Sequence, residues 1–393
     1  MKSIPDGTVT SPKGFVAGAV KAGIKASGGL DLGLLFSPNF CMAAGMFTAN
    51  RVKAAPVLLS QQHVAKGRAQ AVVVNAGCAN ACTGDQGMED AIEMAQLAAN
   101  RLGVIRNDVL VASTGVIGER LPVDRIRDKV GDIALSREGG HDLARAIMTT
   151  DTRPKEVAID AGDFTIGGIA KGSGMIHPTL GTMLAFLTTD AAVGPEFLRE
   201  ALREAMDASF NMVTVDGDTS PNDTVFILAN GMAGSVREGA EGAGVFQQAL
   251  TVACGALARA IAADGEGATR LIEVTVEGAR TVGDARAAAR TIAGSPLVKA
   301  AVHGCDPNWG RIIAALGRSG CEMDESRVEL SLCHVAVFAG GAASAFDEAG
   351  LSAAMGGSEV PIRVRLNLGE HCAVGWGCDL TAEYVTINSD YKT

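Results

Sequence analysis

A threonine that follows a glycine inside an apolar run is the feature of this sequence best suited to chemistry. Gly181 and Thr182 stand in the stretch from Lys171 to Asp190, which is otherwise typical of a buried strand. If the chain cuts itself between them, Thr182 carries a hydroxyl nucleophile and a free α-amino group that can act as its base. The ordinary pKa of such an amine, about 7.7 to 8.0, leaves a useful fraction unprotonated near neutral pH. On these residues alone, an ordinary core strand that contains a threonine remains the alternative.

The stretch from Lys171 to Ala191 resembles the self-cleavage signature of the ornithine acetyltransferase (glutamate N-acetyltransferase, ArgJ) family, which is KGSGMIxPxxATML followed by TTDA. Other blocks similar to the family are spread over nearly the whole chain: Ser113–Gly118, Met148–Lys155, Asp264–Thr269, His303–Arg311 and Tyr384–Ser389. One departure is Gly181, where the family usually has alanine. Because glycine holds backbone strain less well than alanine, we expect this departure to affect the rate of self-cleavage and to leave the nucleophile in place.

The resemblance implies a self-processed acyltransferase of arginine biosynthesis, made of residues 1–181 and 182–393 with two copies of each chain. Thr182 would take acetyl from N2-acetylornithine and pass it to glutamate, without a metal or a nucleotide cofactor. Some members of the family also accept acetyl-CoA as donor, and the sequence does not decide this point. Carried over residue by residue, the oxyanion hole falls on Thr114 and Gly115, the cleaved bond on Gly181 and Thr182, and substrate binding on Thr149, Lys171, Thr182, Glu266, Asn388 and Thr393.

Each of these positions also has an ordinary interpretation. Thr114 and Gly115 offer a hydroxyl and a backbone N–H to an oxyanion, but a Ser-Thr-Gly run is commonly just a turn after a strand. Lys171 could bind a substrate carboxylate, or it could be a solvated loop residue. Glu266 follows a predicted helix, where a carboxylate opposes the helix dipole, and this cost favours a functional role. For Asn388, the alternatives are a tail that closes over the site and a tail that frays.

Two other functions remain open at this stage. An N-terminal-nucleophile aminopeptidase or amidase of related architecture would pass its acyl group to water instead of an amine. An uncleaved metabolite-binding protein would have lost catalysis through Gly181.

Composition favours a globular protein that binds small metabolites. The chain has 393 residues, of which 47% are hydrophobic, and its net charge of −10 argues against nucleic acid or anionic membranes as partners. No apolar leader follows Met1 and no run reaches the length of a membrane span, so we expect a cytoplasmic protein. Nine cysteines with scattered spacing suggest reduced thiols. Cys78, Cys82 and Cys372 lack the paired spacing of a zinc site, and we expect none.

The hydrophobic pattern predicts a mixed α/β (α+β) protein. Predicted helices cover Met88–Leu102, closed by Gly103, and then Phe197–Ala208 and Val245–Ala263. Predicted strands cover Ala71–Asn75, Val109–Ala112, Val213–Asp216, Val225–Leu228, Leu271–Val276, Ile362–Leu368 and Tyr384–Ile387. The family resemblance implies an N-terminal-nucleophile-like sandwich of two sheet layers flanked by helices, with a smaller C-terminal lobe.

Two further clusters are given structural roles. The run from Asp216 to Thr224 lacks the glycine and glutamate of a calcium loop, and we expect a structured turn near the active site. His303 and Cys305 lie two residues apart and leave no room for a substrate between them on a strand, so packing or support is the preferred interpretation over a catalytic dyad.

Overall fold

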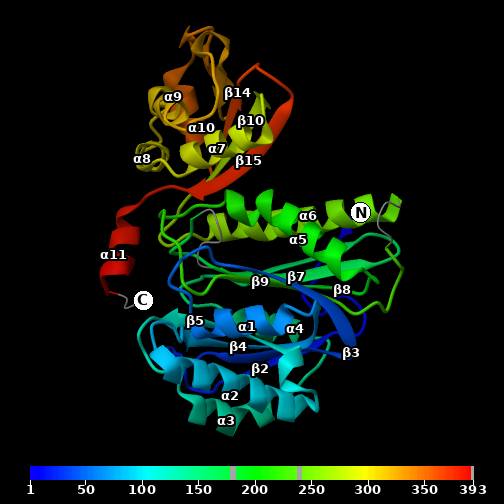
Figure 1. Cartoon of the computed structure of the whole chain (residues 1–393). Coiled ribbons are helices and arrows are strands. Elements are labelled where there is room, and N and C mark those ends of the chain that lie inside the picture. The colour runs from blue at the N-terminus through cyan, green and yellow to red at the C-terminus, as the bar shows by residue number, and fades with distance from the viewer. Residues whose placement is uncertain (178–182, 237–240, 391–393) are drawn as a thin grey trace.

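The computed structural model describes residues 1–177, 183–236 and 241–390 of the chain. They form a larger lobe on a nine-stranded sheet and a smaller C-terminal lobe on a six-stranded sheet (Figure 1). The strands of the larger sheet are β1 (Lys2–Ser3), β2 (Val16–Val20), β3 (Leu32–Phe47), β4 (Arg68–Cys78), β5 (Val109–Val116), β6 (Lys155–Asp160), β7 (Thr165–Lys171), β8 (Leu184–Thr189) and β9 (Thr224–Ala229). The helices of this lobe are α1 (Ala55–Val64), α2 (Gly84–Leu102), α3 (Val123–Lys129), α4 (Gly140–Ala146), α5 (Pro195–Asp207) and α6 (Glu241–Ala263).

Strand β3 folds the large sheet into two layers. Its first part, Leu32–Phe36, pairs with β2 and β4, whereas its last part, Met42–Phe47, pairs with β9. The pairing with β4 shifts register between Phe36 and Cys41, around Pro38, which has no N–H to give to a ladder. As a result, β7, β8 and β9 lie over β2, β4 and β5 (Figure 1).

Alternation along the strands builds three cores. In β8, Leu184 and Phe186 face the core between the two layers, while Ala185 and Leu187 face the outer core. The Phe186 ring stacks on that of Phe226 from β9, with 5.9 Å between ring centroids. Helices α5 and α6 cover the outer face of β7–β9, and α2 and α3 cover the outer face of β4 and β5. This arrangement confirms the predicted sandwich of sheet layers flanked by helices.

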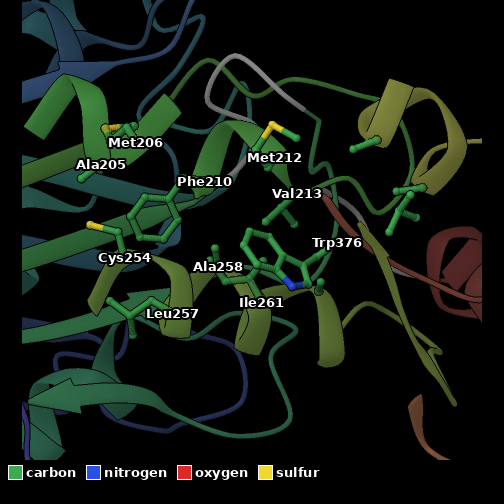
Figure 2. Close-up of a cluster of buried hydrophobic side chains, with 14 of the residues drawn as sticks. Ala205, Met206, Phe210, Met212, Val213, Cys254, Leu257, Ala258, Ile261 and Trp376 are labelled. Atoms are coloured by element: carbon green, nitrogen blue, oxygen red, sulfur yellow. The ribbon is translucent and has the colours of Figure 1, made fainter. Parts of the chain in front are cut away.

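The smaller lobe continues the chain from residue 271. Its elements are β10 (Leu271–Ala279), α7 (Val282–Ala293), α8 (Pro296–His303), α9 (Trp309–Gly317), β11 (Glu329–Leu332), β12 (Val335–Ala339), β13 (Ala342–Ala343), α10 (Glu348–Met355), β14 (Glu359–Arg365) and β15 (His371–Cys378). Strand β10 lies between β14 and β15. Trp376 of β15 packs against Val213, Ala258 and Ile261 of the larger lobe (Figure 2), so a continuous apolar core joins the lobes.

Most predicted elements are present, with shifted ends, and two predicted strands are wrong. Gly103 ends α2 with a left-handed φ of 69°, as predicted. Tyr384–Ile387 lies in helix α11 (Ala382–Asp390), because the Thr381 hydroxyl accepts a hydrogen bond from the Tyr384 N–H and caps the helix start. Val213–Asp216 forms only an isolated bridge, from Val213 to Trp376, and the segment lies along the loop at Ile176 instead of in a sheet.

Helix α6 is long and apolar. In the part of the chain that the structure describes, it is the one helix, over Gly242–Ala263, that could cross a membrane by length and composition. Half of that window is buried inside the protein, where α6 packs on β6, β7 and β15. A core helix passes the same test of length and apolar composition.

Candidate active site

A cavity of about 220 Å³ lies where segments distant in the sequence meet, between the larger lobe and the C-terminal helix. It opens at the end of β5, beside the loop after α4, the end of β7, the loop after α6, and α11. The structure thereby brings together the predicted site residues Thr114, Gly115, Thr149, Lys171, Glu266 and Asn388. Gly181, Thr182 and Thr393 lie outside the described residues.

The end of β5 provides a fixed turn. Gly115 has a φ of 131°, and a Cβ there would lie 2.3 Å from the carbonyl carbon of Gly77, so only glycine fits. The Asn222 side chain donates hydrogen bonds to the carbonyls of Ala79 (2.6 Å) and Ser113 (2.9 Å) and ties this turn to the loop before β9. Thr114 and Gly115 are therefore held in place before any substrate binds, which is what an oxyanion hole requires.

Lys171 is buried and reaches across the cavity. Only 2% of it is exposed, so the structure rules out the alternative of a solvated loop residue. Its Nζ donates a hydrogen bond to the Thr114 hydroxyl at 3.3 Å. Burial lowers the pKa of Lys171, nearby Asp151 opposes that effect, and the positive charge of Lys155 adds to it. The wall of the cavity thus holds a lysine amine next to the predicted oxyanion hole.

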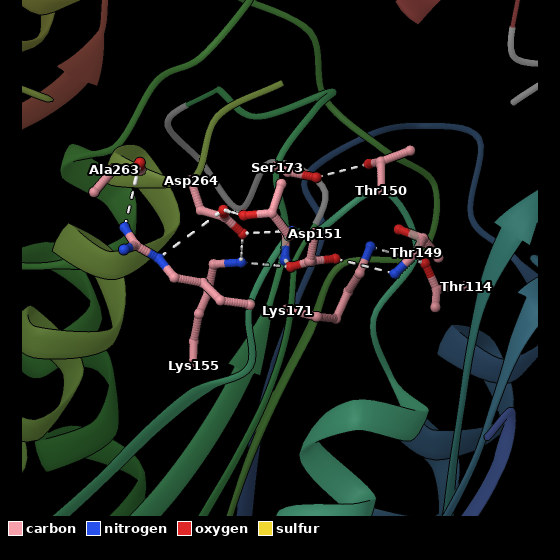
Figure 3. Close-up of polar contacts among 12 residues, drawn as sticks. Thr114, Thr149, Thr150, Asp151, Lys155, Lys171, Ser173, Ala263 and Asp264 are labelled. Carbon is pink, nitrogen blue, oxygen red and sulfur yellow. Dashed lines mark hydrogen bonds and ion pairs between the residues drawn. The ribbon is translucent and has the colours of Figure 1, made fainter. Parts of the chain in front are cut away.

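Behind Lys171 lies a buried network of charges (Figure 3) that sequence reasoning missed. Lys155 Nζ lies 2.6 Å from a carboxylate oxygen of Asp151 and 2.6 Å from one of Asp264. Asp151 also accepts hydrogen bonds from the backbone N–H groups of Thr149 (3.0 Å) and Gly172 (2.7 Å). Burial alone would raise the pKa of Asp151, but Lys171, Lys155 and the Gly172 N–H outweigh it and hold the pKa at about 2.

This network joins three segments that line the cavity. Asp151 orients the Thr149 loop and the backbone next to Lys171, and Asp264 stands two residues before Glu266. The only hint of this network in the sequence was the four-residue spacing of Asp151 and Lys155 inside a family-like block. That spacing predicts an ion pair only where both residues lie on a helix, and no helix was predicted there. Lys155 lies on strand β6, and the pair forms through the tertiary fold.

Glu266 turns from the end of α6 into the cavity. It is 8% exposed, and its backbone N–H donates a hydrogen bond to the Ser173 carbonyl at 2.8 Å. A Cβ on Gly174 would come within 2.4 Å of its carboxylate, so glycine is needed for this close approach. The Asn388 amide donates a hydrogen bond to Glu266 at 2.9 Å. The two predicted substrate-binding residues are therefore in direct contact.

Helix α11 closes one side of the cavity. Tyr384 donates a hydrogen bond through its hydroxyl to Asp216 at 3.2 Å. Asp216 also accepts hydrogen bonds from the backbone N–H groups of Met175 (2.6 Å), Ile176 (2.9 Å) and Asp218 (3.4 Å), and burial raises its pKa. These bonds confirm the prediction of a structured turn at the site, and α11 shows the tail ordered through Asp390.

Asp223 is a second residue that sequence reasoning missed. Its side chain accepts a hydrogen bond from the N–H of Met183, the residue after the predicted nucleophile, at 2.9 Å. The other carboxylate oxygen is buried and has no hydrogen-bond partner among the described residues. Burial raises the pKa of Asp223 well above its ordinary value. A buried acid therefore holds the start of β8.

His303 and Cys305 lie outside the cavity. His303 ends helix α8, so the predicted strand geometry is wrong for this pair, and its Nδ1 lies 3.0 Å from the Asp379 carboxylate. The contact agrees with the preferred supporting role of the histidine. Within the described ranges, no group of three or more His, Cys, Asp or Glu side chains is arranged to hold a metal ion.

Comparison with known proteins places the chain in a family. The ArgJ family model matches residues 16–393. The "Arginine biosynthesis bifunctional protein ArgJ" of Dehalococcoides mccartyi is 55% identical over 99% of this chain and 98% of its own length. The chain belongs to the ArgJ family. Membership confirms the sequence-based resemblance, and with it the prediction of an acyltransferase.

Two solved structures also resemble the chain. The crystal structure of the ArgJ bifunctional protein of Bacillus halodurans is 40% identical with a TM-score of 0.50, and the match covers 52% of this chain and 97% of that one. A structure of ornithine acetyltransferase from Mycobacterium tuberculosis complexed with ornithine is 44% identical with a TM-score of 0.44, and the match covers 45% of this chain and 97% of that one.

Proposed function

We propose that this chain is a self-processed glutamate N-acetyltransferase of arginine biosynthesis, which moves acetyl from N2-acetylornithine to glutamate through Thr182. The observation that carries the proposal is the cavity where six predicted site residues from five separate segments meet. The D. mccartyi relative, whose name assigns it to arginine biosynthesis, supports the pathway.

The first half-reaction forms an ester on Thr182. Its hydroxyl oxygen attacks the acetyl carbonyl of N2-acetylornithine, and its own α-amine takes the hydroxyl proton. The Gly115 N–H and the Thr114 hydroxyl stabilise the negative oxygen that develops, and Lys171 next to Thr114 adds positive charge. The C–N bond then breaks, the α-ammonium returns the proton, and ornithine leaves.

The second half-reaction reverses these steps with glutamate. The glutamate α-amine attacks the ester carbonyl, the C–O bond to Thr182 breaks, and N-acetylglutamate leaves. Ornithine and glutamate differ in distal charge but share an α-carboxylate, for which Lys171 is the buried cation of the cavity. Charge reversal by Lys171→Glu should therefore weaken both half-reactions, and unchanged kinetics would remove Lys171 from this role.

Self-cleavage would leave chains of residues 1–181 and 182–393, and we propose an assembly with two copies of each in the cytoplasm. The B. halodurans chain supports processing, because the match spans nearly all of that chain but only about half of this one. We propose acetyl-CoA as a second donor, and no metal or nucleotide for transfer between the two amino acids.

The decisive experiment combines intact mass spectrometry with acetyl trapping. Brief reaction with N2-acetylornithine and acid quenching should add one acetyl group to the fragment that begins at Thr182. Thr182→Ala should abolish both chain cleavage and transfer, whereas Thr182→Ser should retain part of each at a reduced rate. An exclusively full-length mass after long incubation, or full transfer in Thr182→Ala, would overturn the proposal. Acetyl passed to water without glutamate, at the rate of transfer, would indicate an amidase.

A further inference from the structure

A second cavity, of about 390 Å³, lies close to the catalytic one along the chain. Met175 lines the catalytic cavity, and His177, two residues later, lines the second. The other polar side chains around it are Arg290 and Thr291 of α7, and Arg318 and Ser319 after α9. Among the described residues it is thus lined by two guanidinium groups, an imidazole and two hydroxyls, and by no carboxylate, in a chain of net charge −10.

The two arginines at this cavity differ from a paired arginine nearby in their direct polar contacts. In the part of the chain that the structure describes, neither the Arg290 nor the Arg318 side chain makes a hydrogen bond or an ion pair. By contrast, Arg286, one turn earlier on α7, lies 3.8 Å from Asp207. Arg290 is half-buried, and burial lowers its pKa, with Arg286 adding to the effect and Asp207 opposing it. Cationic groups that make no direct ion pair are stabilised by a bound anion.

Helix ends account for part of this arrangement. Arg290 lies in the last turn of α7 and Arg318 follows α9, and cations are favourable at the carboxyl ends of helices. That effect explains a cation on each helix. It does not require both guanidinium groups to face one cavity together with His177 and two hydroxyls, a set of donors that fits the oxygens of a phosphoryl group.

We propose that this cavity, which we call the arginine cavity, binds the phosphoryl groups of acetyl-CoA. The inference rests on the proposed use of acetyl-CoA as a second donor, because ornithine and glutamate carry no phosphate. With its phosphates held there, the pantetheine arm carries the thioester past Met175–His177 to the catalytic cavity. The Thr182 oxygen then attacks the thioester carbonyl, the C–S bond breaks, and the proton from the hydroxyl ends on the CoA thiol.

The segment between the cavities is well fixed for this purpose. Asp216 holds the N–H groups of Met175 and Ile176, and the Thr214 hydroxyl lies 3.5 Å from His177 Nδ1. The arginine cavity and the catalytic cavity therefore share one hydrogen-bonded segment of the chain, Met175–His177.

A binding measurement tests the site independently of turnover. Titration calorimetry of the mature enzyme with adenosine 3′,5′-bisphosphate should show binding that weakens at least tenfold in the double variant Arg290→Ala, Arg318→Ala. The matched control is Arg286→Ala, which changes a paired arginine on the same helix and should alter the Kd less than twofold. Equal weakening in both, unchanged binding in the double variant, or inorganic phosphate binding as tightly as the bisphosphate would overturn the proposal.

Kinetics separate this inference from the proposed function. In the double variant the KM for acetyl-CoA should rise at least tenfold, while transfer from N2-acetylornithine to glutamate stays as in the wild type and serves as the test of correct folding. Equal loss in both reactions would overturn the arginine cavity. If the wild type does not use acetyl-CoA but binds the bisphosphate through these arginines, the arginine cavity is a phosphoryl-binding site. The proposed use of acetyl-CoA as a second donor is then wrong.

Discussion

The two walls of the catalytic cavity are built in opposite ways. On one wall, Lys171 stands in front of Asp151, Lys155 and Asp264, all buried and bound to one another or to backbone N–H groups. The other wall is helix α11, in which none of the described residues is buried. It contacts the site chiefly through the Tyr384 hydroxyl on Asp216 and the Asn388 amide on Glu266.

This difference means that one wall is rigid and the other can open to admit substrate. A wall of paired, buried charges opens only with the fold itself, whereas an exposed terminal helix held by a few polar bonds opens at low free-energy cost. The groups assigned to chemistry, Thr114, Gly115 and Lys171, belong to the rigid wall. Changes there should alter stability or kcat, and changes in α11 should alter KM.

The largest effect is expected from Lys155→Met. The substitution keeps an apolar stem but removes the cation that lies 2.6 Å from both buried carboxylates, Asp151 and Asp264, which costs about 3 to 5 kcal/mol of unfolding free energy. Urea denaturation followed by circular dichroism measures it. The control is Lys129→Met, which removes a surface pair with Asp132 and should not move the midpoint measurably. Equal shifts of the urea midpoint in both variants would contradict the claim that the buried ion pairs stabilise the fold.

A smaller effect should appear as acid sensitivity. The pKa of Asp151 is depressed from 3.8 to about 2 in the folded protein, so its contribution is present above pH 3.8 and is lost as the pH falls toward 2. The loss amounts to about 2 kcal/mol. Asp216 and Asp223 have raised pKa values and act in the opposite sense, so the comparison with Asp151→Asn isolates the effect. The variant should lose less unfolding free energy than the wild type between pH 5 and pH 2, and parallel curves would contradict the assignment.

Removal of α11 should have an effect on substrate affinity alone. Truncation after Thr381 removes the Asn388 and Tyr384 hydrogen bonds. We expect the KM for N2-acetylornithine to rise about tenfold, which corresponds to a loss of about 1.4 kcal/mol of binding free energy. Chain cleavage should proceed as in the wild type, as seen on a denaturing gel. Val385→Ala, at a side chain that is 65% exposed, is the control and should leave KM unchanged.

The two walls also differ in how well their residues could be predicted from the sequence. The family-like blocks correctly placed Thr114, Thr149, Lys171, Glu266 and Asn388 at one cavity. Such blocks can point to a shared cavity whatever the exposure of their residues. The support behind them was missed, because the contact of Lys155 with Asp264 joins residues 109 positions apart and leaves no local pattern.

Local patterns also explain the errors in the fold. Continuous apolar runs, such as those of β4 and β9, were predicted as strands, and each run is apolar on both faces because it supplies two cores in turn. In α11, the β-branched Val385, Thr386 and Ile387 favour a strand, but no sheet edge is paired with them and the Thr381 cap starts a helix instead. Tertiary context overrode the local preference.

The smallest effect is expected from Tyr384→Phe, and it is the sharpest test of the comparison. The substitution removes only the hydroxyl that donates to Asp216 at 3.2 Å and keeps the ring. A single such bond at a partly exposed side chain contributes about 1 kcal/mol or less, so KM should rise at most about fivefold. The kcat should not change, because Asp216 keeps its bonds to Met175 and Ile176 and the opposite wall is untouched. Steady-state kinetics of N2-acetylornithine-to-glutamate transfer measures both constants, and Asn388→Ala provides the companion change on the same helix. A fall in kcat with constant KM would mean that α11 takes part in the chemical step, and the division between a rigid catalytic wall and an opening binding wall would fail.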